Sequence, residues 1–344
     1  MSAAAQVSPL TTDARPDYAD GARGFMILLV LVGHADPPKL LWKLIYGFHM
    51  PFFFLLSGYL FDAEKYGHMR FWPYCKKRFV SYMIPYFIYA FCNLLLNIPL
   101  EVRRGIVGRA LLESTAKHIF WIFYAIGDIK KTPNCTPLWF LPCLFLCCLL
   151  FYGLQHIPKE SLRWAVCAVF FGISYWLSAA HVPQLPWHVD TALFGTVLMQ
   201  IGFTAKRLRF PQRVPLPYLI AAVAAAIGFF CIVRNRPIDL NSMTLQNAAL
   251  TLVGAVCVNA SVFLLFYKLY RGKLLAWFGR NTMPIFAFNY AANAYLRWLW
   301  EILFPNAALS WWLLAILDVP CLCGVILTVR AVRRRLPTHR GSKR

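Results

Sequence analysis

The sequence predicts an all-α, polytopic integral membrane protein with about ten transmembrane helices. Of its 344 residues, 59% are hydrophobic and only 14% are charged, and the mean hydropathy is +0.54. A soluble domain of this length would leave so much apolar surface uncovered that a bilayer is the expected solvent. Apolar runs separated by short basic segments also repeat along the whole chain, so we expect no additional soluble domain.

A helix that crosses a bilayer needs about 20 mainly apolar residues. By this measure we expect spans at 18–37, 42–61, 79–100, 138–156, 162–180, 189–205, 216–233, 247–267, 274–300 and 309–330. They form one transmembrane domain, 18–330, between a polar tail, 1–17, and a basic tail, 331–344. The first tail contains two prolines and no apolar core, which is not typical of a signal peptide.

The distribution of basic residues predicts the orientation. Most of the 35 Lys and Arg fall in the tails and in every second connecting segment, and cytoplasmic segments are the ones that carry this excess. Both termini are therefore expected in the cytoplasm, and the protein is expected in the inner cell membrane. The exception is 101–137, an expected outer segment that contains six basic residues and an apolar stretch. It can hold a re-entrant or interfacial helix, but an eleventh full span would invert every later loop.

Charge and cysteine usage exclude two other classes. The net charge of +21 lies in blocks between apolar runs, which fits membrane topology better than nucleic-acid binding. The eleven cysteines lie mostly inside apolar runs and form no CxxC pair, so we expect small packing residues and no metal site.

The first span carries two ionisable side chains, Arg23 and His34. The ten residues between them rise only about 15 Å, so at least one of the two lies at hydrocarbon depth, which is costly unless it faces protein or water. Eleven helical steps return to nearly the same face, about 16 Å away. An elongated anionic cofactor fits such a face, with phosphate on the guanidinium and the chemistry at the imidazole. The alternative is an arginine that snorkels to the inner interface and a histidine that ends the helix.

The second span adds His49, two residues before Pro51. The proline frees the carbonyl of Gly47, a defect tolerated at membrane depth only in contact with protein or a cavity. Because the two spans run in opposite directions, His49 is expected in the same outer half as His34. Together they predict one buried polar site, although a chance pair of core histidines remains an alternative.

Later spans supply further candidates. Trp139, just after Pro137, can stack against a sugar or a pantetheine arm, or can belong to an interfacial aromatic belt. Asn289, Asn293 and Arg297 recur every four residues on one face, which suggests that they line a cavity. Asp318 in the tenth span is the expected counter-charge for Arg297, in a structural pair.

At this point the residues resemble a known family. The segments resemble the acyltransferase 3 family of membrane O-acyltransferases, in particular its fucose 4-O-acetylase-like branch, and they are "DGARGFMILLVLVGH", "FHMPFFFLLSGYLF", "KKRFVSYMIPYF", "TPLWFLPCLF" and, more loosely, "FGRNTMPIFAFNY". The resemblance implies transfer of an acetyl or similar acyl group from cytoplasmic acyl-CoA to a hydroxyl of a glycan or lipid-linked sugar. It also implies that Arg23 and His34 are essential, with Asp20 one turn away to fix the guanidinium.

Two positions depart from the family pattern. Many relatives have Arg-x-x-Arg where the third helix begins, but here Ser81 takes the second place, so Lys76, Lys77 and Arg78 are left to meet the donor. Relatives also often carry a histidine where this chain has Asn289, which can form hydrogen bonds but cannot titrate.

The expected chemistry needs a base for the hydroxyl proton and donors for the oxyanion. His34 is the expected base, either for direct attack by the hydroxyl or through an acyl-histidine, and His49 is expected to orient His34, bind the acceptor or donate to the oxyanion. The predicted activity is acetyl-CoA-dependent O-acetylation in surface polysaccharide biosynthesis, with an acyl-CoA, a glycan or lipid-linked sugar, membrane lipids and polysaccharide-assembly proteins as partners. The alternatives are a transporter or flippase for a glycan or small solute, and a binding or sensory protein that keeps the scaffold without the chemistry.

Overall fold

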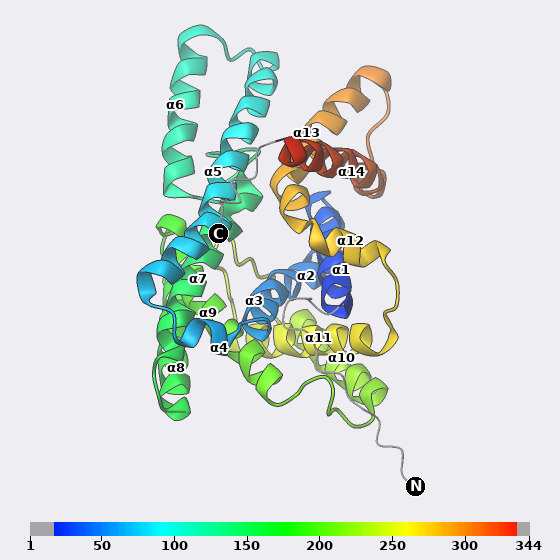
Figure 1. Ribbon diagram of the computed structural model, residues 1–344. Coiled ribbons are helices and arrows are strands. Elements are labelled where there is room, and N and C mark those ends of the chain that lie inside the picture. Colours follow the sequence, from blue (N-terminus) through cyan, green and yellow to red (C-terminus); the bar gives the residue numbers. More distant parts are fainter. Residues whose placement is uncertain (1–16, 336–344) are drawn as a thin grey trace.

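The computed structural model describes residues 17–335, and every helix or strand element in that range is helical (Figure 1). The predicted tail 1–17, apart from Asp17, and most of the predicted tail 331–344 lie outside the described residues. The helices are α1 (Asp17–His34), α2 (Lys39–Tyr46), α3 (His49–Tyr59), α4 (Ala63–Gly67), α5 (Phe71–Arg103), α6 (Gly108–Tyr124), η1 (Thr136–Trp139), α7 (Phe140–Gln155), α8 (Glu160–Ala179), η2 (Pro186–His188), α9 (Val189–Arg207), α10 (Pro217–Arg234), α11 (Ala248–Leu269), α12 (Leu274–Arg280), α13 (Thr282–Leu303) and α14 (Trp311–Arg335).

Within residues 17–335, seven segments are long and apolar enough to cross a membrane. They are Lys39–Tyr59, Phe71–Arg103, Thr136–Gln155, Glu160–Ala179, Pro217–Arg234, Ala248–Leu269 and Trp311–Val332. The other three predicted spans are also helical: 18–37 holds α1, 189–205 lies in α9, and 274–300 is divided between α12 and α13. The fold is therefore all-α with several candidate membrane helices, while the count of ten and the orientation stay predictions.

Much of the outer surface is apolar, as lipid contact requires. Large side chains such as Leu95, Trp176 and Phe230 are 63–65% exposed on α5, α8 and α10. On α8 only Cys167 and Ser174 are fully buried, and more than half of the residues of the helix are exposed. Soluble proteins rarely expose contiguous apolar patches of this kind.

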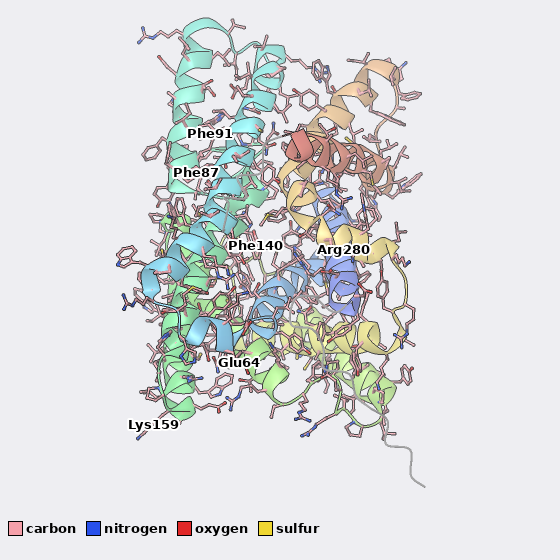
Figure 2. All side chains as sticks on the ribbon, viewed as in Figure 1. Glu64, Phe87, Phe91, Phe140, Lys159 and Arg280 are labelled. Carbon is pink, nitrogen blue, oxygen red and sulfur yellow. The ribbon has the colours of Figure 1, made fainter. Side chains whose placement is uncertain are left out.

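The segment 101–137 contains a full helix, α6, which begins shortly after the long α5 ends. The two helices stand side by side in Figure 1, and Phe123 of α6 packs against Phe87 and Phe91 of α5, both labelled in Figure 2. α6 carries Arg109, Glu113 and other polar residues and is not one of the seven candidate spans. A helix, which the sequence left open for this segment, is thus present.

The second predicted span is broken at Gly47 and Phe48, next to the Gly47 carbonyl that the proline was expected to free. α2 ends at Tyr46 and α3 begins at His49, so Pro51 lies in the first turn of α3, where its missing N–H costs little. The break lies at Gly47 and Phe48, three to four residues before the proline. Asn259 Nδ2 of α11 donates to the Phe48 carbonyl at 2.9 Å, which satisfies a backbone group at the break.

A row of aromatic rings joins the two halves of the fold. Phe140, near the middle of the view in Figure 2, contacts Phe54 of α3 with ring centroids 5.1 Å apart and Phe286 of α13 at 5.8 Å. These rings belong to the largest buried cluster, which also includes Ile27 and Val30 of α1. The helices that carry the candidate site therefore share one core.

Candidate active site

α1 and α13 run in the same direction and meet along one face of each. Arg23 bonds to Thr282, His34 to Asn289, and Asp36, just beyond α1, to Arg297. The residue numbers of these contacts rise together along the two helices. Arg23 and His34 therefore share a face of α1, as the spacing predicted, and that face points at protein.

Two glycines bring α12 against α1 beside Arg23. A Cβ atom on Gly24 would lie 1.8 Å from the Leu275 carbonyl oxygen, and one on Gly279 would lie 1.8 Å from the Asp20 carbonyl oxygen. Any side chain at either position would push the helices apart. The close approach places Arg280 and Thr282, at the α12–α13 turn, next to the first turns of α1.

Arg23 lies in a cluster of charged and polar groups. Its Nη2 donates to Thr282 Oγ1 at 3.1 Å, and its Nη1 lies 3.5 Å from Asp20 Oδ1. Arg280 pairs with Asp20 at 3.7 Å and with Asp17 at 3.6 Å; Figure 2 labels Arg280 at the end of α12. The expected contact between Asp20 and Arg23 is confirmed, and Thr282 is a second side chain that orients the guanidinium.

His34 is the first member of a chain of three buried or half-buried side chains. Its Nδ1 lies 2.6 Å from Asn289 Oδ1, and Asn289 Nδ2 donates to Asp318 Oδ2 at 2.5 Å. Because the amide uses its N–H on Asp318, it presents oxygen to the imidazole, so Nδ1 must carry the hydrogen. Nε2 of neutral His34 is then the nitrogen with a free lone pair. Asn289 and Asp318 are both 0% exposed.

Two further contacts fix the end of α1. Asn293 Nδ2 donates to the His34 carbonyl oxygen at 3.1 Å, and the Tyr290 ring stands edge-on to the His34 ring with centroids 4.8 Å apart. Asn293 and Asn289 are thus used to hold His34. Their predicted role in substrate binding stays untested.

His49 lies at the start of α3, close to the same place. Its Nδ1 lies 2.8 Å from the Ile45 carbonyl oxygen, which can only accept, so Nδ1 carries the hydrogen and Nε2 of the neutral ring is an acceptor. Its ring contacts Tyr46 at 4.8 Å, and it lies within electrostatic range of His34. The two histidines therefore belong to one site, as expected.

The predicted pair of Arg297 with Asp318 is wrong. Arg297 Nη2 binds Asp36 Oδ2 at 2.8 Å near the surface, where the two side chains are 39% and 85% exposed. Asp318 of α14 instead accepts from Asn289, which lies about two helical turns before Arg297 on α13. The spacing of one polar residue every four predicted the correct face of α13. It did not predict which side chain pairs with Arg297.

Trp139 is buried and lies at the end of η1. It is 5% exposed, and its ring contacts His188 at 4.9 Å and Phe140 at 6.0 Å. It is therefore part of the protein interior and not of an interfacial belt. Its expected stacking against a substrate stays a prediction.

The predicted donor cluster is split between surface and interior. Lys76 and Lys77 are exposed, whereas Arg78 lies over the rings of Tyr66 and Tyr74, with 4.7 and 5.0 Å to the centroids. Among the described residues, Arg78 Nε has no hydrogen-bond partner. Tyr82, one turn further along α5, feels the charges of both Arg78 and Arg23, so these two guanidinium groups face one region.

Ser81 does not replace the missing second arginine. Its Oγ donates to the Lys77 carbonyl within its own helix at 2.9 Å. Thr282 and Tyr290 belong to the site as well, but nothing in the sequence singled them out, because a lone threonine or tyrosine in an apolar run carries no spacing signal.

These elements define a class: a helical membrane protein with a charged cluster and a tautomer-fixed histidine at two levels of one buried interface. Residues 17–330 match the model of the acyltransferase 3 family, described as an acyltransferase domain. The chain therefore belongs to that family. No curated protein and no solved structure matched the chain.

Proposed function

We propose that this protein is an O-acetyltransferase that moves an acetyl group from acetyl-CoA to a hydroxyl of a surface polysaccharide or a lipid-linked sugar. Family membership supports acyl transfer. The observation that carries the proposal is the hydrogen-bond chain from His34 through Asn289 to Asp318, because it leaves an imidazole nitrogen able to take a proton. The resemblance to the fucose 4-O-acetylase-like branch supports a sugar acceptor.

His34 Nε2 acts as the general base. The acceptor hydroxyl oxygen attacks the thioester carbonyl carbon while its proton passes to Nε2, and the carbon–sulfur bond then breaks. The leaving thiolate takes the proton from the imidazolium, so the base is restored and free CoA leaves. A positioned base of this kind typically contributes about 10²- to 10⁴-fold to the rate.

His49 binds the acceptor in this scheme. Because its Nδ1 hydrogen is used on the Ile45 carbonyl, the neutral ring offers only an acceptor at Nε2. It suits a sugar hydroxyl, which can donate, and does not suit a developing oxyanion. Of the roles expected for His49, the donor role is thus the least compatible with this geometry.

Arg23 and Arg78 hold the phosphates of the donor. Guanidinium groups bind phosphate through paired N–H donors, and Arg78 has an unpaired buried Nε to offer. The exposed Lys76 and Lys77 add positive charge at the entrance. Arg23 and His34 are about 16 Å apart along α1, which suits a donor whose thioester lies far from its phosphates.

The arrangement also favours a location. We take the protein to lie in a bacterial-type inner membrane with both termini in the cytoplasm. The Arg23 end of α1 then faces cytoplasmic acetyl-CoA, and the His34 end faces outward. The acceptor then approaches from the outer side. Polysaccharide-assembly proteins are the expected neighbours of such an enzyme.

The test follows label from donor to acceptor. Membranes that contain the protein are given acetyl-CoA with a labelled acetyl group, and label is measured in the extracted glycan and lipid-linked sugar. The proposal expects base-labile label that depends on the protein. A transporter would leave no label in the glycan, and that outcome would contradict the proposal.

A further inference from the structure

A pocket lies at the end of α6, and no residue of α1 or α13 lines it. Its volume is about 430 Å³, within the usual range for small-molecule sites. Six of its lining residues combine an aromatic wall with polar groups, and they are Phe120, Trp121, Tyr124, Asp128, Lys131 and Gln184. Nothing in the proposed chemistry at His34 uses these side chains.

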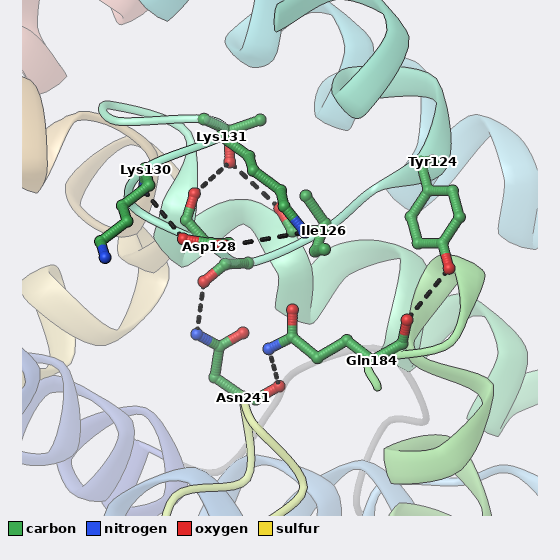
Figure 3. Close-up of polar contacts among 9 residues, drawn as sticks. Tyr124, Ile126, Asp128, Lys130, Lys131, Gln184 and Asn241 are labelled. Atoms are coloured by element: carbon green, nitrogen blue, oxygen red, sulfur yellow. Dashed lines mark hydrogen bonds and ion pairs between the residues drawn. The ribbon is translucent and has the colours of Figure 1, made fainter. Parts of the chain in front are cut away.

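Three chain segments are tied together to form the pocket, as Figure 3 shows. Tyr124 Oη donates to the Gln184 carbonyl oxygen at 3.0 Å, and Gln184 Nε2 donates to the Asn241 carbonyl oxygen at 2.7 Å. Asn241 Nδ2 in turn donates to the Gly127 carbonyl oxygen at 2.6 Å. Because each bond joins segments far apart in sequence, the pocket is a built feature of the fold.

Backbone strain is concentrated around the same place. Ala125, which ends α6, has a φ of 60°, and Trp187 and His188 have φ values of 57° and 55°. Non-glycine residues avoid this left-handed region at a cost of order 1–3 kcal/mol each, and such strain tends to collect at ligand sites. Glycine would remove the cost at each position, yet the sequence places none there.

The chemistry of the lining suits a sugar. A pyranose has a face of C–H groups that packs on aromatic rings and a rim of hydroxyls that needs donors and acceptors. Here Trp121 and Tyr124 form an edge-on pair, 5.4 Å between centroids, beside the carboxylate of Asp128. Asp128 Oδ1 already accepts from the Lys130 backbone N–H at 2.9 Å, and the lone pairs that remain on the carboxylate can accept from a sugar hydroxyl, which a lipid chain does not offer.

The charge of the pocket favours a neutral ligand. Lys131 Nζ lies 3.8 Å from Asp128 Oδ2 and 4.3 Å from the centre of the Trp121 ring. The ammonium and carboxylate therefore neutralise each other within the pocket. A phosphate or uronate would gain from Lys131 but be repelled by Asp128.

The loop that holds Asn241 leads from the pocket toward Tyr46 and Tyr290. Asn241, on the pocket side, donates its backbone N–H to Asp239 Oδ1 at 2.9 Å, and Asp239 lies within electrostatic range of Tyr46 and Tyr290. Tyr290 contacts the His34 ring. A ligand in the pocket would thus lie apart from the reacting group, because the pocket lining contains neither His34 nor His49.

We propose that the pocket at the end of α6 binds a neutral pyranose unit of the acceptor glycan other than the unit that is acetylated. This inference rests on the proposed function, because it takes the acceptor to be a glycan. The enzyme would then prefer an oligosaccharide or polymer over a single sugar.

The test measures binding apart from catalysis. The full-length protein in lipid nanodiscs is mixed with neutral oligosaccharides released by mild acid from the envelope of the cells that make it, and binding is followed by saturation-transfer NMR. We expect wild type and His34→Ala to bind, and Trp121→Ala to bind about 3- to 10-fold more weakly because ring contacts of this size are lost. Asp128→Asn, a surface change that keeps the shape, should also weaken binding.

The control is Trp176→Ala, which removes an indole that is 63% exposed on α8 and outside the pocket. It should bind as wild type does. Absence of binding by wild type, or equal binding by all four variants, overturns the pocket. If the wild-type protein transfers no label but its binding still depends on Trp121, the proposed function is overturned and the pocket stays in place.

Discussion

His34 Nδ1 and Asn289 Oδ1 lie 2.6 Å apart, although 255 residues separate them in the chain. The amide oxygen points at the imidazole because the amide nitrogen is used on Asp318. This one relationship decides which nitrogen of His34 is available for chemistry, and it makes a residue on α14 part of the site.

Loss of the Asp318 carboxyl should slow acetyl transfer. In Asp318→Ala the Asn289 amide is free to turn its N–H₂ toward Nδ1, which favours the tautomer with hydrogen on Nε2. We expect kcat to fall about 10- to 100-fold, the usual cost of losing a group that orients a functional histidine. Asp318→Asn keeps an acceptor and should lose less.

The measurement that separates this role from simple stability compares kcat with the acetyl-CoA KM. In Asp318→Ala kcat should fall, and the acetyl-CoA KM should not change. Asp36→Asn is the matched control, since Asp36 pairs with the surface residue Arg297 and such pairs contribute little. Equal kcat values for Asp318→Ala and Asp36→Asn would contradict the hydrogen-bond chain from His34 to Asp318.

Removal of the Thr282 hydroxyl should weaken donor binding. Thr282 Oγ1 accepts from Arg23 Nη2 at 3.1 Å, so Thr282→Val removes one of the partners that orient the guanidinium toward the phosphates. We expect the acetyl-CoA KM to rise about 3- to 10-fold with kcat nearly unchanged, because one lost hydrogen bond has a net value of about 1 kcal/mol. Thr282→Ser, which restores the hydroxyl, should behave as wild type; equal KM values for all three would show that Thr282 does not position Arg23.

The contact between α1 and α12 should not tolerate a methyl group. Gly24→Ala and Gly279→Ala each place a Cβ about 1.8 Å from a backbone oxygen, so the helices must separate. Overpacking of this kind costs about 1–3 kcal/mol or more and should lower the thermal midpoint measured in detergent.

Gly153→Ala is the control for this pair, because no atom lies within 4 Å of its Cβ position on α7. It should leave the midpoint unchanged or raise it slightly, since alanine favours helix over glycine. Equal midpoints for Gly24→Ala and Gly153→Ala would contradict the close approach.

Much of the fold follows from the sequence for clear physical reasons. Apolar runs of about 20 residues must become helices in a bilayer, and each of the ten predicted spans coincides with helix. The neighbours packed against the break in the second span did not follow, because they are tertiary contacts. A Cβ on Gly47 would lie 2.7 Å from the Ile232 side chain of α10, and no pattern within the span records that neighbour.

The site shows the same division. Helical spacing predicted that Arg23 and His34 share a face, and a charge one turn away predicted the contact of Asp20. Periodicity along α13 also placed Asn289 and Asn293 toward the interior. The partner of Asp318 was mistaken because charge complementarity alone favoured Arg297, whereas the relative positions of α13 and α14 along their axes bring an amide opposite it.

The central claim is that His34 is the base, and the most direct measurement is the rate of acetyl transfer from labelled acetyl-CoA to glycan by His34→Ala in purified, reconstituted protein. Thermal unfolding of the variant first establishes that it is folded. The account predicts a rate at least about 10²-fold below wild type, with acetyl-CoA binding retained through Arg23 and Arg78. Transfer at the wild-type rate by a folded His34→Ala protein would contradict it.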